Sequence, residues 1–544
     1  KHDIIGYNWL YSDTSTVSNN KLGGRYDLQS LVKNKADLIK DSISLGMDGS
    51  VIYTLMSLKL LNDCNIRFYG GLHEDVDFIF KIYLKSNKIG VFDYPVYLKN
   101  NREGSIINTI SEKHIEGYFR SYIEIFNYLK ENYSLDDDIL KYYYIGVVGI
   151  IATRLKEIWQ NSGEDKEKLY LYKKLHSEYL TLKNRILQNI DTPSLNTKYF
   201  IIFEKFCNIM KKENDIVNSI DIFLKEVLIK SWSCYDLHHS VFLAPNQVRT
   251  CCKRFFVDNK MKGDVSLLDE VHYNFEEFNA KNILKEKKEL YKRINRGEST
   301  ECSGCPFLEF KDWGYINTLD IEHISFEYHS VCNMKCIYCS DTYYDGKKVK
   351  YNLLGLIDEM IQSKQLDNCN SIVWGGGEPT LDKDFDQLLL KMAKEFPNIK
   401  QRVITNATVF TKTVKDLLDT NNISITTSID AGTEKTFYKI RKNKNLMKVF
   451  ENLKVYSMQR PENITLKYIV MKENNSLAEI ETFTKLIKKN NLSGCNFQIS
   501  FDFKEESIDI ESAIAMVVLY GLLVRLNVRL VFFDDLLRQR LESI

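Results

Sequence analysis

The hydrophobic pattern of the chain becomes regular from about residue 319. Short runs of β-branched and aromatic residues alternate there with longer stretches in which apolar residues recur every three or four positions. The short runs predict strands at 321–328, 371–374, 401–405, 423–429, 464–470 and 495–503. The longer stretches predict helices at 353–364, 385–395, 411–418, 446–458, 477–489 and 510–526. Six βα units in series predict an α/β fold, with a parallel sheet that right-handed crossovers curve into a full or partial barrel over 319–544.

Three further parts precede this barrel. Residues 1–110 mix predicted strands and helices, with a helix expected around residues 48–61. Residues 111–230 show helical periodicity and contain Pro193 as their only proline, which predicts a connector of long helices. Residues 231–318 are irregular and rich in cysteine. We therefore expect four parts in the chain.

Composition excludes several classes of protein. The chain has 544 residues, of which 44% are hydrophobic and 27% charged, so it is globular rather than disordered or collagen-like. A net charge of +1 disfavours a nucleic-acid partner. No run reaches the roughly 18–20 apolar residues that a membrane span needs, and no signal peptide is visible. We therefore expect a cytoplasmic protein. Because the chain begins at Lys1, inside a predicted strand, we also expect that its N-terminus is a truncation point.

The placement of the cysteines indicates metal binding. Seven of the twelve cysteines fall between residues 251 and 339. In a large chain this crowding is typical of metal ligation in a reducing compartment rather than of disulfides. The scattered cysteines are expected to be inert buried thiols. They are Cys64, Cys207, Cys234, Cys369 and Cys495.

A C-x3-C-x2-C motif, formed by Cys332, Cys336 and Cys339, follows the first predicted barrel strand. Three thiolates on one loop can bind three corners of a cubane iron–sulfur cluster and leave the fourth iron for another ligand. Gly376, Gly377 and Glu378 follow the second strand, where glycines let the backbone approach a ligand and a carboxylate can hold an ammonium group. A structural zinc site with His329 as fourth ligand is the alternative.

This order of motifs resembles the radical S-adenosylmethionine (SAM) enzymes from about residue 319 to the C-terminus. The resemblance implies a 4Fe–4S cluster on the three cysteines, with SAM chelating the open iron. It implies that Tyr338 packs on the adenine and that Gly376, Gly377 and Glu378 bind the methionine amino group. It implies polar contacts to the ribose or carboxylate of SAM from Thr405, Asn406, Ser428, Asp430 and Arg441. Helix capping for Ser428 or Asp430, and a solvated helix end for Arg441, are the structural alternatives.

The chemistry that this resemblance implies is reductive cleavage of SAM. An electron from the cluster breaks a carbon–sulfur bond, and the resulting 5′-deoxyadenosyl radical removes a hydrogen atom from a substrate. The protein then positions substrate and excludes water. Such an enzyme needs an electron donor, for example flavodoxin or ferredoxin. Glu327 and His329 lie beside the cysteine loop and are candidates to face substrate, although a structural role is favoured for His329.

A second cysteine group lies before the barrel, at Cys251, Cys252, Cys302 and Cys305. Four thiols can enclose one tetrahedral zinc or one cubane. The segment is similar to the SPASM or twitch modules that bind an auxiliary 4Fe–4S cluster in many radical SAM enzymes, although those modules usually follow the barrel. Auxiliary 4Fe–4S is the favoured interpretation, and zinc stays open. Vicinal cysteines seldom both ligate one metal, which leaves open a free thiol at Cys251 or Cys252.

Residues 1–110 resemble the C-terminal half of a family 2 glycosyltransferase of the GT-A fold. The resemblance rests on residues 66–68, in a strand predicted at 66–69, on 73–78, on 94–97, in an extended segment at 89–98, and on 102–106. It implies that Asp75, beside Glu74, is the general base that activates an acceptor hydroxyl. The alternative is that both carboxylates stabilise the start of a helix. The nucleotide-binding half would precede Lys1, so this chain alone is expected not to transfer a sugar.

These resemblances together predict a radical SAM enzyme in a glycan or carbohydrate pathway, fused to a glycosyltransferase. One alternative is a peptide- or protein-modifying enzyme of the SPASM type. Another is a zinc-stabilised scaffold attached to a glycosyltransferase. Modification of nucleic acid is a further alternative, which the neutral charge disfavours. The substrate, whether sugar, glycan or peptide, is not identified by the sequence.

Overall fold

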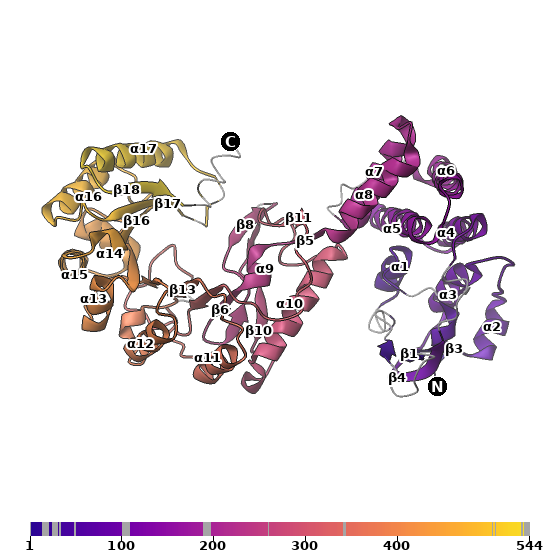
Figure 1. Ribbon diagram of the computed structural model, residues 1–544, viewed down its shortest axis with the longest axis horizontal. Helices are drawn as coiled ribbons and strands as arrows, with labels where there is room; N and C mark the ends of the chain where they lie inside the picture. The colour runs from indigo at the N-terminus through magenta and orange to yellow at the C-terminus, as the bar shows by residue number, and fades with distance from the viewer. Residues whose placement is uncertain are drawn as a thin grey trace. The chain divides into compact units, whose positions relative to one another are not determined.

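The computed structural model describes most of the chain. The described residues are 2–12, 21–23, 31, 34–47, 50–100, 109–188, 197–258, 260–340, 344–502, 504–505, 507–534 and 537, with backbone only at 9–12, 21–23, 93–96 and 98–100. They form two compact units, which we call unit 1 (Lys1–Ser231) and unit 2 (Trp232–Ile544) (Figure 1). No helix among the described residues has the length and apolar character needed to cross a bilayer.

Unit 1 begins with a small mixed sheet. Strand β1 (Ile4–Ser12) pairs antiparallel with β2 (Lys21–Gly23) and β3 (Thr54–Met56), and parallel with β4 (Ile89–Asn100). The helices of this part are α1 (Lys35–Ile43), α2 (Leu58–Cys64) and α3 (Glu74–Lys85). Helix α3 buries one apolar face, including Phe78 and Ile82, as its spacing of apolar residues requires.

Long helices follow, as the periodicity of 111–230 predicts. They are α4 (Glu112–Asn132), α5 (Asp137–Asn161), α6 (Asp165–Leu182, continued by a π turn at Lys183–Leu187), α7 (Lys198–Lys212) and α8 (Ile216–Ile229). Helix α5 packs closely on α1, because a Cβ at Gly146 would lie 1.8 Å from the carbonyl oxygen of Ile43. These helices and the mixed sheet therefore belong to one compact unit.

Two predicted elements of unit 1 are wrong. The helix predicted at 48–61 is a 3-10 turn (Val51–Tyr53) followed by β3 and the start of α2. The strand predicted at 66–69 is irregular, because α2 ends at Asn65 in the left-handed conformation (φ 49°) and Arg67 donates to the carbonyls of Leu61 and Ile66. The segment 102–106, on which the glycosyltransferase resemblance partly rests, lies outside the described residues.

Unit 2 is built on a ten-stranded sheet. In spatial order its strands are β10 (Ser266–Asp269), β7 (Gln247–Arg249), β6 (Ser240–Leu243), β12 (His323–Phe326), β13 (Ser371–Trp374), β14 (Gln401–Ile404), β15 (Ile423–Ser428), β16 (Ile464–Val470), β17 (Asn496–Phe501) and β18 (Leu530–Phe533). All neighbours from β6 to β18 pair in parallel, whereas β7 and β10 are antiparallel. The six predicted strands are confirmed as β12–β17.

The sequence analysis missed the two outermost parallel strands, β6 and β18. Each has four residues, which is too short to show a clear period. Strand β6 comes from the cysteine-rich part and pairs directly with β12. The predicted boundary after residue 318 therefore does not divide the sheet.

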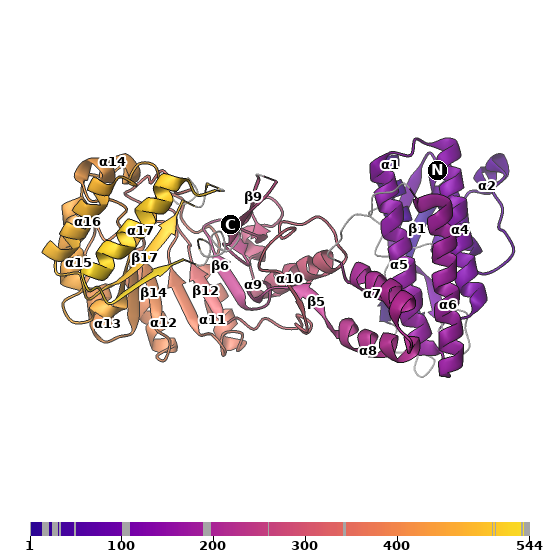
Figure 2. The same ribbon diagram turned by 90° about the horizontal axis from the view of Figure 1, so that it is seen from above.

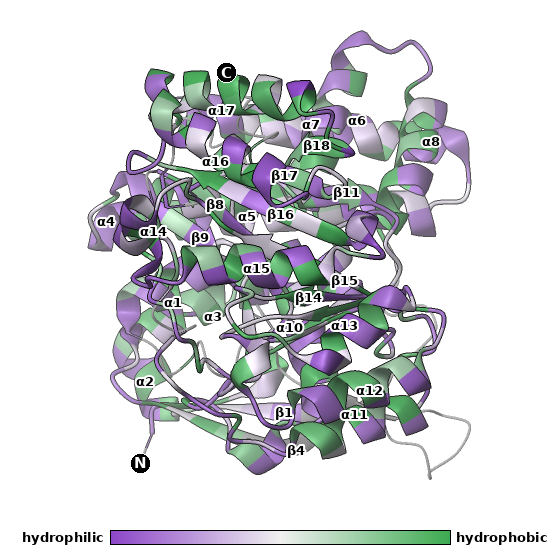
Figure 3. Ribbon diagram, turned by 90° about the vertical axis from the view of Figure 1, so that its left-hand side faces the viewer, coloured by the Kyte–Doolittle hydropathy of each residue, from purple (hydrophilic) through white to green (hydrophobic). Residues whose placement is uncertain are grey.

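Helices cover one face of this sheet (Figure 2). They are α11 (Leu353–Gln362), α12 (Phe385–Glu395), α13 (Lys412–Asp419), α14 (Glu434–Arg441), α15 (Leu446–Tyr456), α16 (Leu477–Lys489) and α17 (Ile510–Arg525). Their apolar faces and that face of the sheet form the main core of unit 2. Helix α17 also exposes apolar side chains, among them Ile510 and Val517 (Figure 3).

The cysteine-rich part adds smaller elements around the edge of the sheet. They are β5 (Ser231–Ser233) paired with β11 (Glu309–Lys311), the hairpin β8 (Arg254–Val257) and β9 (Lys260–Gly263), α9 (Tyr235–His239) and α10 (Ala280–Asn295). Short 3-10 turns complete unit 2 at Phe275–Glu277, Pro379–Leu381 and Pro461–Asn463.

Candidate active site

A cavity of about 170 Å³ opens at the carboxyl ends of strands β12 to β15. This is the end of a parallel sheet at which ligands bind in βα folds. Every residue that the sequence analysis places at the catalytic cluster or SAM lines the cavity, except Asp430. They are Cys332, Cys336, Cys339, Tyr338, Gly376, Gly377, Glu378, Thr405, Asn406, Ser428 and Arg441.

The cavity's three thiols lie on the irregular loop after β12. Backbone hydrogen bonds from Lys335 and Ile337 to the carbonyls of Arg441 and Ile440 hold this loop against the end of α14. Burial, followed by the charges of the other two thiols, raises the pKa of the Cys339 thiol to about 12. A metal or cluster that binds these sulfurs must therefore supply the charge that keeps them deprotonated.

The spacing of the thiols does not match a zinc site. Thiolates on one tetrahedral zinc at about 2.3 Å lie roughly 3.8 Å apart. Among the described residues, no three cysteine sulfurs lie within 4.8 Å of one another. The wider spacing fits a cluster whose corners are separate metal ions.

Glu378 is a buried carboxylate that forms no ion pair with any residue that the structure describes. One carboxylate oxygen accepts hydrogen bonds from the hydroxyls of Thr380 and Thr405 (both 2.6 Å), and the other accepts the backbone N–H of Asn406 (2.6 Å). Its side chain is 1% exposed, and burial raises its pKa. A carboxylate oriented by neutral donors, next to three thiols, is suited to bind a cationic group of a ligand.

The glycines before Glu378 allow two stretches of backbone to pack together. A Cβ at Gly377 would lie 2.4 Å from the carbonyl oxygen of Val331, and the N–H of Glu378 donates to that same oxygen (2.8 Å). Gly376 adopts a positive φ of 88°. The glycine run is therefore explained first by contact with the chain's own cysteine loop, and not only by approach to a ligand.

Asp430 lies outside the cavity and orients two residues that line it. It accepts hydrogen bonds from the Tyr338 hydroxyl (2.9 Å) and from Arg441 (2.8 Å), and it accepts the N–H of Ile469. Asp430 is fully buried, and these three hydrogen bonds already occupy its carboxylate. In the structure Asp430 positions Tyr338 and Arg441, whereas the resemblance implied that Asp430 contacts SAM. The carboxylate of Asp430 also pairs with the positive charge of Arg441 within the protein.

Thr405, Asn406 and Ser428 end neighbouring strands at the cavity. Thr405 donates to Glu378, and the Asn406 amide donates to Asn333 (2.7 Å) and approaches the sulfur of Cys332 at 4.0 Å. Ser428 is half-buried at the end of β15. None of the three caps a helix, which removes the capping alternative for Ser428.

The second group of thiols contains a member that the sequence analysis missed. Burial, followed by the neighbouring charges of Cys251, Cys234 and Cys305, raises the pKa of the Cys302 thiol. Cys234, Cys251 and Cys302 also pack in one small apolar cluster. The sequence analysis predicted that Cys234 is an inert buried thiol. The one sequence feature that pointed to it was indirect: if Cys251 and Cys252 do not both bind one metal, a fourth ligand must come from another part of the chain.

Cys252 faces different neighbours. Burial raises the pKa of its thiol to about 12, and the charges that act on this thiol come chiefly from Glu327 and Arg249. By residue, Cys252 is exposed, whereas Cys251 is half-buried. Two successive residues of an extended chain point to opposite sides, so a vicinal pair divides naturally between two environments. The structure therefore groups Cys234, Cys251, Cys302 and Cys305, and separates Cys252 from them.

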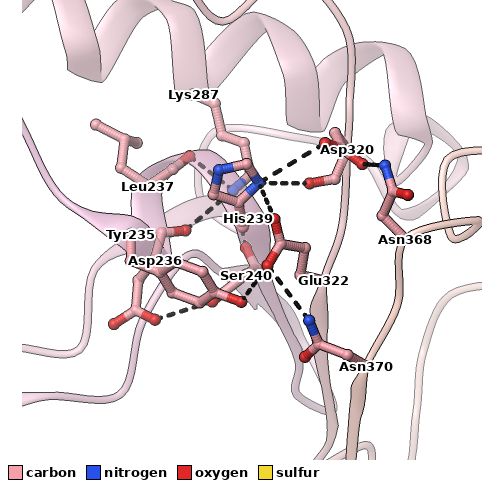
Figure 4. A network of polar contacts seen from close by, with 10 residues as sticks. All are labelled: Tyr235, Asp236, Leu237, His239, Ser240, Lys287, Asp320, Glu322, Asn368 and Asn370. Atoms are coloured by element: carbon pink, nitrogen blue, oxygen red, sulfur yellow. Dashed lines mark hydrogen bonds and ion pairs between the residues drawn. The ribbon is translucent and has the colours of Figure 1, made fainter. Parts of the chain in front are cut away.

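A buried lysine, Lys287, feels the charges of two members of this thiol group, Cys234 and Cys251. Figure 4 shows its hydrogen bonds to the backbone. Lys287 of α10 is 0% exposed and donates to the carbonyl oxygens of Leu237 (2.9 Å) and Ser240 (2.8 Å). Burial lowers its pKa to about 7, while the charges of Cys234, Asp236 and Cys251 act in the opposite direction. A buried ammonium group is suited to offset the negative charge of thiolates.

Figure 4 also shows a polar group at the other end of the sheet. His239 and Glu322 immediately precede β6 and β12, and with Asp320 they place three potential metal-binding atoms within 4.8 Å. The carboxylates are already hydrogen-bonded, since Glu322 accepts from Tyr235 (2.9 Å) and Asp320 from Asn368 (2.9 Å). Polar groups at the amino ends of parallel strands generally serve stability.

Unit 1 has a separate cavity of about 630 Å³. Glu74 and Asp75 line it from the first turn of α3, together with His73, Tyr118 and Arg154. Burial, followed by the charges of Arg154, His114 and Arg120, lowers the pKa of His73 to about 3. Glu74 and Asp75 start a helix and also line a cavity. Their placement therefore fits both the general-base interpretation of Asp75 and the alternative that both carboxylates stabilise the start of the helix.

Comparison with known proteins identifies the chemistry of unit 2. Residues 326–487 match the family model described as the radical SAM superfamily. This part of the chain is a radical SAM domain. A 4Fe–4S cluster and SAM are accordingly the cofactors of this domain, and the cavity lined by Cys332, Cys336 and Cys339 lies within the matched residues.

Relatives support this domain but cover it only in part. GTP 3′,8-cyclase of Clostridium botulinum strain Hall is 29% identical over 161 residues, which is 29% of this chain and 50% of the relative. GTP 3′,8-cyclase of Vibrio parahaemolyticus is 27% identical over 162 residues, or 29% of this chain and 48% of the relative. The chain thus spans about half the length of these curated relatives.

Solved structures of radical SAM proteins are only distantly similar. Streptococcus suis SuiB bound to S-adenosylmethionine has a TM-score of 0.33 and 14% identity, over 47% of this chain and 56% of that chain. Native anSMEcpe with bound AdoMet and Cp18Cys peptide has a TM-score of 0.27 and 19% identity, over 33% and 50%. None of the proteins named here is a glycosyltransferase, so the resemblance of residues 1–110 stays a prediction.

Proposed function

We propose that unit 2 binds SAM in the cavity between the cysteine loop and Glu378, and cleaves it reductively to act on a substrate. The observation that carries this proposal is Glu378, a buried carboxylate with no cationic partner that lines the same cavity as three thiols. The ammonium group of the methionine part of SAM would complete its hydrogen bonding. When bound, the cofactors supply one-electron chemistry that ends in a 5′-deoxyadenosyl radical.

The protein's own residues position the cofactors. Cys332, Cys336 and Cys339 would hold the cluster and leave one iron free. Asp430 holds the Tyr338 hydroxyl, which fixes the ring at the cavity wall, where the resemblance places the adenine. Gly377 lets the segment before Glu378 pack on the cysteine loop, so the two binding groups keep a fixed separation.

SAM binding and cleavage can be tested separately. Reconstituted protein should form 5′-deoxyadenosine from SAM when dithionite is present. Glu378→Gln should retain the iron of the wild type but bind SAM more weakly. Equal SAM affinity in the two proteins would contradict the assignment of Glu378.

We also propose that Cys234, Cys251, Cys302 and Cys305 hold a second, auxiliary 4Fe–4S cluster. Neighbouring charges link the four thiols, and Lys287 provides a buried amine close to Cys234 and Cys251. Four protein ligands would leave no open iron, so this cluster suits electron transfer or structure rather than SAM binding. A flavodoxin- or ferredoxin-like donor is the proposed source of electrons.

The substrate is proposed to belong to a glycan or carbohydrate pathway, with a peptide as the alternative. The cavity of unit 1 supports the first choice, because Asp75 lines a space of about 630 Å³ in which a hydroxylated ligand would meet a carboxylate base. Asp75→Asn should then abolish any transfer to an acceptor by the full-length protein while leaving SAM cleavage unchanged.

A further inference from the structure

The face of the unit 2 sheet that points away from the helices is polar. Side chains on paired positions of neighbouring strands share a face. Arg402 of β14 pairs with Ser424 of β15, and four residues further on Ser428 pairs with Lys467 of β16. Val403 and Ile425 lie on the opposite face, in the core beneath the helices. Arg402 and Lys467 therefore project from the same, uncovered face.

Neither of these two cations has a partner within the part of the chain that the structure describes. By residue, Arg402 is exposed and Lys467 is half-buried, and neither side chain makes a hydrogen bond or an ion pair. Burial of the guanidinium group lowers the pKa of Arg402, and Arg402 is among the charges that act on Lys467. Burial lowers the pKa of Lys467, so an anion beside it would offset an existing cost.

Other charged groups on this face pair with one another. Arg249 pairs with Asp264 (3.0 Å) and with Glu327, and Asp430 pairs with Arg441. The charges of Asp534 and Asp430 also favour the charged form of Lys467, but neither carboxylate makes an ion pair with it. Arg402 and Lys467 are thus left without an ion pair among the described residues.

These cations lie on a continuous path to the SAM cavity. Ile404, two residues after Arg402 on the same face of β14, lines the cavity. Ser428, which pairs with Lys467, lines it as well. A molecule held by the two cations would therefore extend toward the place where the radical is proposed to form.

We propose that Arg402 and Lys467 form an anion subsite that holds a phosphate or carboxylate group of the substrate. This inference rests on the proposed function, and it narrows the substrate to an anionic molecule. A guanidinium group binds either anion through two parallel hydrogen bonds, and an ammonium adds a point charge. A neutral glycan or an uncharged peptide segment would leave both cations unpaired.

Cys252 is a built-in reporter for this subsite, since the residue is exposed, although burial of its sulfur raises the pKa of the thiol to about 12. Its charge acts on Arg402, so it faces the same space. In reconstituted protein, alkylation of Cys252 by anionic iodoacetate and by neutral iodoacetamide can be compared by peptide mass spectrometry. The ratio of the two rates reports the attraction of anions and cancels changes in the reactivity of the thiol itself.

The double variant Arg402→Gln/Lys467→Met should lower this ratio by about tenfold, the lower end of the effect of a charged cleft on a local ion concentration. The matched control Arg460→Gln/Lys485→Met also removes one arginine and one lysine, but from outside this face. It should leave the ratio of the two alkylation rates unchanged. Pyrophosphate or succinate should protect Cys252 in the wild type and in the control but not in the double variant. The more effective protector identifies the group as phosphate or carboxylate.

An unchanged ratio in the double variant, or absence of protection by both probes in the wild type, would overturn the subsite. Formation of 5′-deoxyadenosine is measured on the same samples. If the wild type makes none, the proposed function fails, while the labelling ratio still decides whether anions bind at Arg402 and Lys467. If deoxyadenosine forms but the ratio does not change, only the subsite fails.

Discussion

The two thiol groups of unit 2 differ in number, origin and surroundings. Cys332, Cys336 and Cys339 lie on one loop and line a cavity that also contains Glu378. Cys234, Cys251 and the pair Cys302 and Cys305 come from three separate segments. Cys234, Cys251 and Cys302 pack among apolar side chains, and the charges of Cys234 and Cys251 act on Lys287. Three thiols beside a cavity leave room for an exchangeable ligand, whereas four enclosed thiols complete a coordination shell. The number and enclosure of the thiols thus separate a reactive centre from a closed one.

The largest effect is expected from removing a thiol of the three-thiol group. Cys336→Ala should reduce 5′-deoxyadenosine formation to background, because two thiolates cannot hold a cluster with one open iron. Asp75→Ala, in unit 1, is the control and should keep full SAM cleavage. If the Cys336 variant still cleaves SAM, the assignment of the three thiols as ligands of the catalytic cluster is wrong.

The four-thiol group is tested by its iron. Cys234→Ala should lose up to about four irons per chain, the content of one cubane. Cys252→Ala is the matched control, because its thiol faces Glu327 and Arg249, and it should keep all of its iron. The reverse result would restore Cys252 as the ligand.

Glu378 should control SAM affinity more than cleavage once SAM is bound. Loss of a hydrogen bond to a charged group costs about 1.5–3 kcal/mol, or roughly 10- to 150-fold in Kd for Glu378→Gln. Burial raises the pKa of Glu378, so lowering the pH should protonate it and weaken SAM binding. Equilibrium binding across pH should show this dependence in the wild type and lose it in Glu378→Gln.

Lys287 should tune the four-thiol centre. Replacing it with Met removes a buried positive charge, which makes it harder to add an electron nearby, so the midpoint potential of the second cluster should become more negative. The first cluster should keep its potential. A redox titration followed by electron paramagnetic resonance separates the two, and equal potentials in Lys287→Met and wild type would argue against this placement.

The smallest effect is expected at Tyr338. Its hydroxyl donates to the carboxylate of Asp430, which lies outside the cavity, so loss of this bond affects SAM only through the position of the ring. Tyr338→Phe keeps the ring and should weaken SAM binding only a few-fold. A loss as large as that of Glu378→Gln would show that the hydroxyl, and not the ring, is the important feature.

The contrast between the thiol groups also explains what could be predicted from sequence. The C-x3-C-x2-C loop and Glu378 follow strands with clear periodicity, so both their chemistry and their place were predictable. Cys234 could not be identified as a candidate ligand from the sequence. It lies far from Cys302 along the chain, no spacing motif links the two residues, and only the fold brings them together. Asp430 was recognised as a site residue, but its partners Tyr338 and Arg441 became visible only in three dimensions. Strands β6 and β18 were missed because four residues carry too little pattern.

The most direct test of the central claim is 5′-deoxyadenosine formation by anaerobically reconstituted protein, with SAM, dithionite and a parallel count of iron and sulfide. We predict deoxyadenosine together with about eight irons per chain, enough for two cubanes. Zinc without iron, and no deoxyadenosine, would contradict the account and favour a scaffold with structural metal sites.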